Sequence, residues 1–306
     1  MQNINTITPD GVLLINKHAG VTSHDIVGKV RRLYGTRAVG HAGTLDPMAT
    51  GVLVVLLGRA AKASEYLGGE GKRYAARLRL GLTTDTEDIT GAVLTHTDDL
   101  PTSDAVLSVI PRFIGTIKQV PPMYSALKRD GQKLVDLARQ GITIEREARE
   151  ITVSALTCTP TDDPAEYELD VRCSGGTYIR TLCADIGASL GCGGVMSALC
   201  RTEACGFPIE KAHTIDALEA MDMSERLSLL IPTVELFSDL PSLTLTAFNY
   251  KLIRNGCAVA LSKLKIVHPL ATRVRLYAPD GSFFALGEIV SAEEGLALKT
   301  IKIFTL

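Results

Sequence analysis

The chain has 306 residues, a length that fits two domains and can bury a sizeable core without disulfides or metals as staples. Hydrophobic residues make up 46% and charged residues 22%, a globular balance that excludes disordered and fibrous proteins. The formal net charge of −2 argues weakly against a nucleic-acid partner, but the charges are not evenly spread.

The N-terminal half predicts strands and one helix around a loop rich in Gly and Thr. In chain order we expect a buried strand at 11–16, a helix at 23–34 capped by Ser23, a loop at 40–51, a buried strand at 52–57 and a half-buried strand at 72–80. Residues 72–80 alternate in polarity, which places Arg73, Arg77 and Arg79 together on the outer face of their strand.

The second half predicts a mixture of helices and strands. We expect a helix at 103–113 capped by Ser103, an irregular mobile connection at 119–130, a short helix before Gly141, strands near 142–157 and 166–173, and a helix at 182–190. The chain breaks near 238–242, and turns at Asn255-Gly256 and Asp280-Gly281 separate short β-like stretches beyond it. This predicts one domain at 1–238 and a small all-β domain at 239–306.

Charge is segregated along the chain. Residues 11–79 hold eleven Lys and Arg against four Asp and Glu, and residues 112–151 hold eight against five. Acidic residues gather at 85–104, 162–170 and 203–239. This pattern is compatible with a basic face for RNA or phosphate, although an ordinary solvated surface also explains it.

Localisation is predicted from three absences. The first ten residues show neither a basic start nor an apolar stretch, so no signal peptide is expected. The longest apolar run, residues 52–57, is far shorter than the ~20 residues of a membrane helix. The seven cysteines form no Cys-x-x-Cys pair and indicate reduced thiols. These features predict a cytoplasmic protein without a membrane partner.

One loop stands out chemically. Residues 40–51 (GHAGTLDPMATG) contain a single carboxylate, Asp46, which Pro47 holds in an extended conformation. Gly43 and Gly51 allow a ligand or another chain to come close. Alone, this pattern is also that of a plain Asp-Pro turn.

The motifs around this loop resemble one family. The runs GHAGTLDPMATGVL, KRYAARLRLGLTTDTED, QVPPMYSALK and GGTYIRTLCADIG are similar, in this order over residues 11–240, to those of the bacterial tRNA pseudouridine-55 synthases, the TruB-type family. The resemblance implies an α/β (α+β) fold with a mixed, largely antiparallel sheet. It also implies that residues 239–306 form a PUA-like, RNA-binding β-barrel.

The implied activity is the conversion of a uridine in the tRNA T loop, at position 55, to pseudouridine. The base must leave the sugar, turn and rejoin through C5, and a carboxylate serves this chemistry as nucleophile or base. The resemblance implies that Asp46 is this catalytic carboxylate. It further implies a monomer that binds the tRNA T stem-loop and requires no metal, cofactor or protein partner.

The resemblance implies further residues that bind the substrate. Arg180 is the expected cationic partner of Asp46, because an isolated buried charge is costly. Tyr74 is expected to stack on the target base, Tyr178 to lie against the nucleotide, and Leu199 to line the pocket. If residues 177–180 are extended, Tyr178 and Arg180 project to the same side.

Other residues are expected to act on the RNA outside the pocket. His41 is interpreted as a wedge that helps to extrude nucleotides, not as a catalytic base. Lys128, Arg129 and Lys133, in an insertion at 119–150, are expected to clamp RNA phosphates. Lys17 is expected to be structural or to face a phosphate. Its turn departs from the family pattern, because Asn16 and His18 stand where Asp and Pro are usual.

Two alternatives stay open. One is the guide-RNA-dependent relative of archaea and eukaryotes, which shares a TLDP loop and a tail barrel; His41 and the continuous insertion favour the stand-alone enzyme. The other is an RNA-binding or RNA-folding protein without chemistry. It would be favoured by loss of the site residues, and Asp46, Tyr74, Tyr178 and Arg180 are all present.

Overall fold

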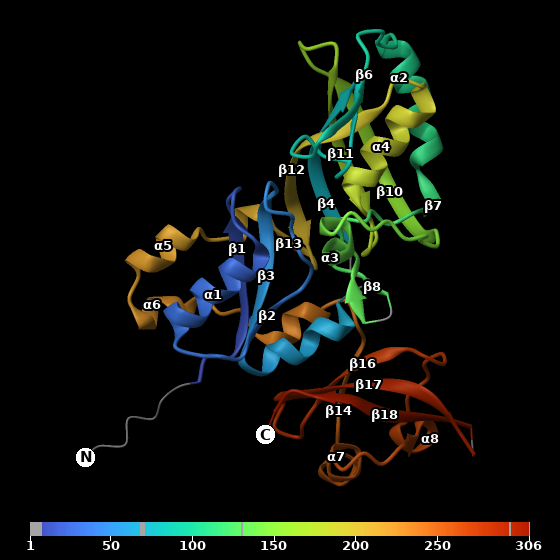
Figure 1. Ribbon diagram of the computed structural model, residues 1–306. Helices are drawn as coiled ribbons and strands as arrows, with labels where there is room; N and C mark the ends of the chain where they lie inside the picture. Colours follow the sequence, from blue (N-terminus) through green and yellow to red (C-terminus); the bar gives the residue numbers. More distant parts are fainter. Residues whose placement is uncertain (1–7, 68–70, 130, 294, 306) are drawn as a thin grey trace.

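The computed structural model describes residues 8–67, 71–129, 131–293 and 295–305. Residues 1–7, on which most of the signal-peptide prediction depends, lie outside the described residues. The described strands form a nine-stranded sheet, a five-stranded sheet and two small two-stranded ribbons (Figure 1). None of the helices in the described part of the chain combines the length and apolar character needed to cross a bilayer.

The large sheet has the order β1-β3-β12-β4-β11-β10-β7, with two short strands at its margins. Its strands are β1 (Gly11–Lys17), β2 (Val39–His41), β3 (Thr50–Leu57), β4 (Lys72–Leu80), β7 (Gly115–Gln119), β10 (Arg149–Pro160), β11 (Glu166–Cys173), β12 (Gly194–Ala204) and β13 (Phe207–Pro208). Only β3 and β12 pair in parallel; the other described pairings of this sheet are antiparallel. The mixed, largely antiparallel α/β fold is therefore confirmed.

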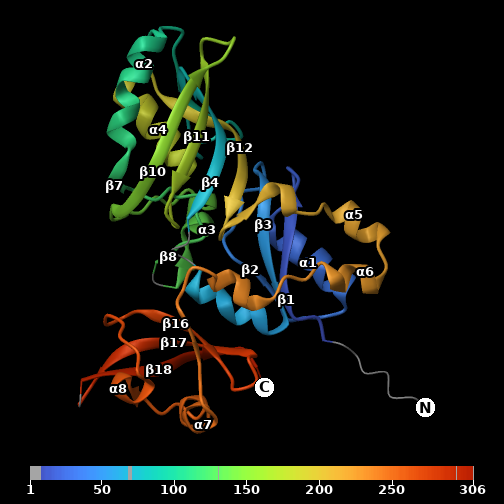
Figure 2. The ribbon, with the colours of Figure 1, turned by 180° about the vertical axis from the view of Figure 1, so that it is seen from behind.

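Helices pack on this sheet and extend beside it (Figures 1 and 2). They are α1 (Ser23–Tyr34), α2 (Ser103–Val109), α4 (Ile179–Leu190), α5 (Ile215–Ala220) and α6 (Met223–Ser228). The predicted caps were wrong by one residue: Thr22 caps α1 in a reciprocal capping box with Asp25, and Thr102 caps α2. The Ser23 hydroxyl instead bonds the backbone of Leu45, in the loop between β2 and β3.

The apolar run in β3 is buried on both of its faces. Leu53 and Val55 face the core that contains α1, whereas Val52 and Val54 face a second core that reaches the C-terminal sheet. A strand buried on both faces has no polar alternation, which is why this segment reads as a continuous hydrophobic run. The loop that precedes the strand contributes Ala42 to the second core and Leu45 to the first.

The outer face of β4 is less basic than its sequence indicates. The predicted alternation is correct, but each arginine meets a carboxylate: Arg73 pairs with Asp170, Arg77 with Glu166 and Glu168, and Arg79 with Asp163 and Glu166. These partners come from the acidic segment 162–170, because β11 lies antiparallel beside β4. The charge surplus of residues 11–79 is partly neutralised within the sheet.

The insertion leaves the sheet at β7 and returns at β10. It contains β8 (Lys128–Arg129), β9 (Gln132–Lys133) and α3 (Leu134–Arg139). The strand expected at 142–157 instead spans 149–160, and residues 142–148 have no regular structure. Gln119 and Arg149 are paired across β7 and β10, so the two ends of the insertion meet.

The C-terminal sheet has the order β14-β16-β17-β18-β15. Its elements are β14 (Ser242–Thr244), α7 (Ala247–Arg254), β15 (Val259–Ala260), α8 (Leu261–Leu264), β16 (Arg273–Tyr277), β17 (Phe283–Ala292) and β18 (Gly295–Ile303). The prediction of an all-β tail was wrong because α7 and α8 pack with the sheet. The sheet itself is compatible with the predicted PUA-like domain.

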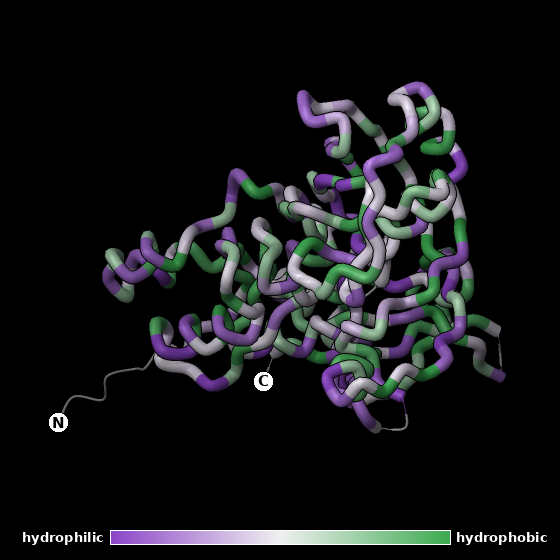
Figure 3. Tube along the Cα trace, turned by 45° about the horizontal axis from the view of Figure 1, so that its top comes forward, coloured by the Kyte–Doolittle hydropathy of each residue, from purple (hydrophilic) through white to green (hydrophobic). Residues whose placement is uncertain are grey.

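The C-terminal sheet docks on a 3-10 segment, η1 (Gly58–Tyr66), below β2 (Figure 2). The Tyr66 hydroxyl donates to the Ile301 carbonyl (3.1 Å), and Lys62 donates to the Ile303 carbonyl (3.2 Å). The rings of Phe237 and Phe304 contact each other at a tilted angle in the shared core. Hydrophilic segments mark the protruding turns of the molecule (Figure 3).

Candidate active site

The loop between β2 and β3 carries Asp46 and is fastened at nearly every residue. The Ser23 hydroxyl accepts from the Leu45 N–H (2.8 Å) and donates to the Leu45 carbonyl (3.1 Å). The Asp46 carbonyl accepts from the Ala49 N–H (3.1 Å). The backbone around the carboxylate is therefore fixed before any ligand binds.

Arg201 of β12 holds the same loop from inside the protein. Its side chain is fully buried, and it donates to the carbonyls of Val52 (2.7 Å), Gly43 (3.1 Å) and Thr44 (3.4 Å). Gly51 makes this approach possible: its φ is +100°, and a Cβ there would lie 2.2 Å from the Arg201 carbonyl oxygen. Only glycine fits where β3 and β12 meet.

Lys17 fastens the other side of the loop and does not face a phosphate. Its side chain is fully buried, and Nζ donates to the carbonyls of His18 (3.0 Å), Val21 (2.9 Å) and Pro47 (3.3 Å). Burial lowers the pKa of Lys17 to about 8, against the opposing attraction of Asp46. The enclosed amine does not support the predicted contact with RNA and fits the structural alternative.

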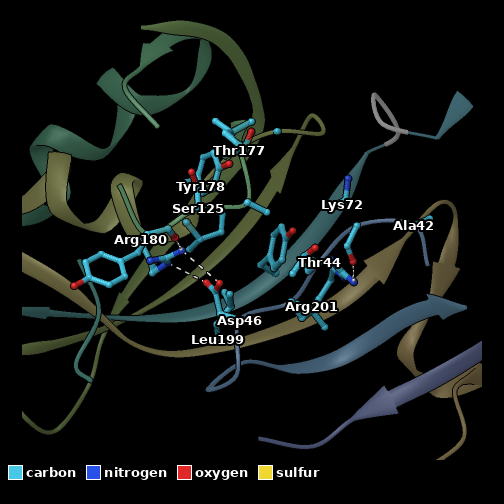
Figure 4. A pocket seen from close by; sticks show the side chains of 18 of the residues that line it. Ala42, Thr44, Asp46, Lys72, Ser125, Thr177, Tyr178, Arg180, Leu199 and Arg201 are labelled. Atoms are coloured by element: carbon cyan, nitrogen blue, oxygen red, sulfur yellow. Dashed lines mark hydrogen bonds and ion pairs between the residues drawn. The ribbon is translucent and has the colours of Figure 1, made fainter. Parts of the chain in front are cut away.

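Asp46 and Arg180 form a two-point ion pair (Figure 4). Arg180 Nε lies 2.9 Å from Asp46 Oδ2, and Nη2 lies 3.3 Å from Oδ1. The Arg180 side chain is 6% exposed, whereas that of Asp46 is 34% exposed. The guanidinium is thus enclosed and orients a carboxylate that remains open to a ligand.

The remaining donors of Arg180 are also satisfied. Nη1 donates to the Thr86 carbonyl (3.0 Å) and lies 3.9 Å from Asp88 Oδ2, and Nη2 donates to the Tyr124 carbonyl (2.8 Å). Tyr124 belongs to the insertion, so Arg180 joins the insertion to Asp46. This fully bonded guanidinium has one fixed position.

Burial raises the pKa of the Asp46 carboxyl above its ordinary value, and Arg180 opposes that shift. The neighbouring Asp88 carboxylate adds to the rise. Because these effects oppose each other, loss of the Arg180 cation would change the pKa of Asp46. Its proton affinity therefore reports on the Arg180 contact.

A cavity of about 490 Å³ opens over Asp46, within the size range of small-ligand sites. Arg180, Tyr178 and Ser125 lie on one side of Asp46, and Lys72, Arg201 and Thr44 on the other (Figure 4). Tyr74 and Leu199 also line the cavity, and both belong to the core as well. The structure thus brings together Asp46, Tyr74, Tyr178, Arg180 and Leu199, the residues that the family resemblance implies.

The route by which Tyr178 and Arg180 reach the cavity differs from the prediction. Residues 177–180 are not one extended segment: Tyr178 is the extended N-cap of α4, and Arg180 is already helical. Both side chains nevertheless line the cavity. The first turn of α4 replaces the expected strand alternation.

His41 lies in β2, half-buried, and is not among the residues that line the cavity. Burial lowers its pKa, and the positive charge of Arg201 adds to this effect. Both effects favour the neutral imidazole over the charged one. Its neighbour Ala42 lines the cavity, so His41 lies just beyond the cavity rim.

The basic residues of the insertion lie on the β8–β9 ribbon. Lys128, Arg129 and Lys133 are all exposed, and Lys133 also lines the cavity. Arg129 donates to the Glu145 carbonyl, which ties the ribbon to the returning chain. These three charges face solvent beside the cavity.

Sequence reasoning missed Arg201 and Asp88. No local pattern distinguishes Arg201 from a surface arginine, since only the fold buries it. Asp88 had a local signal: its carboxylate accepts from the Thr86 hydroxyl (2.9 Å) and from the Thr90 N–H (2.9 Å), an Asp-x-Thr turn. Among the described residues, no group of three His, Cys, Asp or Glu could hold a metal ion.

Two family models match the chain in succession. Residues 31–179 match the N-terminal domain of TruB family pseudouridylate synthases, and residues 180–235 match the tRNA pseudouridylate synthase B C-terminal domain. A tRNA pseudouridine synthase B of Syntrophotalea carbinolica is 43% identical over 89% of this chain and 90% of its own length. That of Aromatoleum aromaticum is 42% identical over 91% and 88%.

Solved structures with the same fold cover nearly the whole chain. A chain of a Cbf5-Nop10-Gar1 complex has a TM-score of 0.72 and 23% identity, over 97% of this chain and 85% of its own. A chain of an H/ACA RNP bound to a substrate RNA containing 2'-deoxyuridine has a TM-score of 0.71 and 22% identity, over 100% and 88%.

Proposed function

Because the chain belongs to the TruB family of pseudouridylate synthases, we propose that it isomerises the uridine at position 55 in the T loop of tRNA, with Asp46 as the catalytic carboxylate. The chain is a pseudouridine synthase by family. The choice of Asp46 as the catalytic carboxylate is supported by one observation above all. Within the part of the chain that the structure describes, Asp46 is the only aspartate or glutamate that lines the cavity, and Arg180 holds it in an open, two-point ion pair.

The reaction breaks the bond from N1 of uracil to C1′ and forms a bond from C5 to C1′, with a proton moved from C5 to N1. An ionised Asp46 serves as nucleophile or base at the sugar, or as nucleophile at the base. Each route needs the charged carboxylate in a fixed place. Arg180 favours the charge and sets the place, and Tyr74 and Tyr178 offer rings and an apolar wall to the detached base.

Residues 1–238 are proposed as the catalytic domain and residues 239–306 as the RNA-binding domain. The insertion at 119–150 is proposed to clamp the T stem-loop through Lys128, Arg129 and Lys133. The guide-RNA-dependent alternative has weaker support, because the Cbf5 chain shares 23% identity with this chain whereas the curated tRNA pseudouridine synthases B share 42–43%.

The test is incubation of an unmodified tRNA transcript with the purified chain, followed by detection of pseudouridine at each position. We expect pseudouridine at position 55 alone, without added metal or cofactor. A transcript with cytidine at this position is the matched control and should stay unmodified. Modification elsewhere, or none, would contradict the proposal.

Binding to tRNA is expected to weaken steeply with salt despite the net charge of −2. Each phosphate contact releases counterions, so removing one contact lowers the slope of log affinity against log salt by about 1. We expect this change for Lys128→Ala and for Lys133→Ala. Affinity measured by filter binding between low and physiological salt gives the slope.

Arg77→Ala is the matched control, because Arg77 is exposed but paired with carboxylates of β11. Its slope should equal that of the wild type. Equal slopes for all three variants and the wild type would show that the insertion does not face phosphate.

His41 is proposed to hold the T loop open by its bulk. His41→Gln and His41→Phe should therefore keep substantial activity on tRNA, and His41→Ala should lose more. A base already unstacked needs less work to flip, so a loosened T-loop substrate should reduce the penalty. Turnover of each variant on both substrates measures this difference.

A general base would behave differently. All three substitutions would then cost about 10²–10⁴-fold on both substrates. Such a uniform loss would refute the wedge. The place of His41 outside the residues that line the cavity supports the mechanical role.

A further inference from the structure

One buried amide holds both polar groups of the Tyr178 backbone. Gln119 Nε2 donates to the Tyr178 carbonyl (3.0 Å), and Gln119 Oε1 accepts from the Tyr178 N–H (2.8 Å). Gln119 is 2% exposed. A primary amide is the side-chain group that offers a neutral donor and an acceptor side by side in one plane.

This contact joins two parts of the site. Gln119 is the last residue of β7, where the insertion leaves the sheet, and Tyr178 is the N-cap of α4. The Tyr178 carbonyl also accepts from the Leu182 N–H (3.0 Å), the first bond of the helix. The amide therefore fixes the point at which α4 begins.

We propose that Gln119 is a positioning residue for the isomerisation. By hydrogen-bonding both backbone polar groups of Tyr178, it places the Tyr178 ring and, two residues later, the Arg180 guanidinium over Asp46. The inference rests on the proposed function. Gln119 does not line the main cavity, so it acts only through residues that do.

The contacts of Arg180 are sensitive to small displacements, because its donors bond three separate segments of the chain. It bonds Asp46, the Thr86 carbonyl and the Tyr124 carbonyl at 2.8–3.3 Å. A shift of about 1 Å at the start of α4 would break several of these contacts together. Misplacement of this size in an active site costs up to about 10²-fold in rate.

The first test is Gln119→Met, which keeps the size of the side chain and removes both bonds. We expect kcat to fall about 10–10²-fold with KM changed only a few-fold, because the substrate-lining residues are all retained. Initial steady-state rates over a range of tRNA transcript concentrations give both parameters. A wild-type kcat for this variant would overturn the proposal.

The second test uses Gln119→Glu, whose effect depends on protonation. A protonated carboxyl accepts from the Tyr178 N–H and donates to its carbonyl, so both bonds are kept. An ionised carboxylate cannot donate and faces the carbonyl oxygen. Charged groups surround this position: Arg149 pairs with Gln119 across β7 and β10 and, with Glu150, lines a small cavity beside Gln119 and Tyr178, and Arg180 follows Tyr178 on α4.

The ratio of Gln119→Glu to wild-type kcat should therefore be near one at low pH and fall as pH rises through the pKa of the introduced carboxyl. Taking the ratio removes the pH dependence of the substrate and of the assay, which is the same for both proteins. Reversible recovery on acidification also separates this effect from misfolding. A ratio that does not change with pH would overturn the proposal.

Gln140→Met and Gln140→Glu are the matched controls, because Gln140 is an exposed glutamine in the same insertion. Both should keep wild-type kcat at every pH, which separates the effect from a negative charge added near RNA. The wild-type assay separates the two hypotheses: an inactive wild type contradicts the proposed function, whereas an active wild type matched by the Gln119 variants contradicts only this inference.

Discussion

Asp46→Asn is expected to abolish isomerisation, with a loss of about 10⁴-fold or more, while affinity for tRNA stays within a few-fold of the wild type. The substitution keeps the shape of the side chain and removes the charge that every proposed route requires. The contacts that hold the loop come from Ser23, Lys17 and Arg201 and reach only backbone groups. The loop should therefore survive the change.

Pseudouridine formation on the transcript, together with filter binding and thermal melting, measures activity, affinity and folding separately. Asp99→Asn is the control, because Asp99 is exposed. It should leave all three unchanged. Easily measurable turnover by folded Asp46→Asn would remove Asp46 from the catalytic role.

Much of the site could be predicted because its parts are local in sequence. The Gly, Thr and Pro residues of 40–51 predict the loop that carries Asp46, and the apolar run at 52–57 predicts the strand β3. The meeting of Asp46, Tyr74, Tyr178 and Arg180 came from the family resemblance, because nothing local indicates that segments more than 100 residues apart converge.

The environment of charged groups could not be predicted. Lys17 and Arg201 are fully buried, although their side chains usually lie at the surface. Arg73 pairs with Asp170 only because β4 and β11 align in one register. Pairing register depends on the whole sheet, and a count of charges along the chain does not contain it.

Helix α7 was not predicted because an Asn-Gly pair is typical of a hairpin turn and also of the end of a helix. Asn255-Gly256 predicts a hairpin turn, but Gly256 lies just beyond α7 with φ +84°. Its N–H donates to the Ile253 carbonyl (3.0 Å), and the Cys257 N–H donates to the Leu252 carbonyl (3.1 Å). Glycine after a helix supplies the same left-handed conformation as glycine in a turn.

Arg180 tests the electrostatic part of the proposal, and two variants separate its charge from its geometry. Arg180→Met removes both, and we expect kcat/KM to fall about 10²–10⁴-fold. Arg180→Lys keeps a cation but loses the two-point contact with Asp46 and the planar reach to Thr86 and Tyr124, so it should also be impaired. Loss of rate alone does not distinguish the variants.

The acid limb of the pH profile distinguishes them. A nearby cation favours the ionised carboxyl and lowers its pKa, so removing the cation lets burial and Asp88 raise the pKa of Asp46 further. The fall of kcat/KM on acidification should therefore begin at higher pH in Arg180→Met than in the wild type, and close to the wild-type pH in Arg180→Lys. Arg77→Met, which removes an exposed arginine of the same size, should leave both rate and profile unchanged. An acid limb that stays in place in folded Arg180→Met would show that the guanidinium does not govern the ionisation of Asp46, and its role would then be to orient the carboxylate alone.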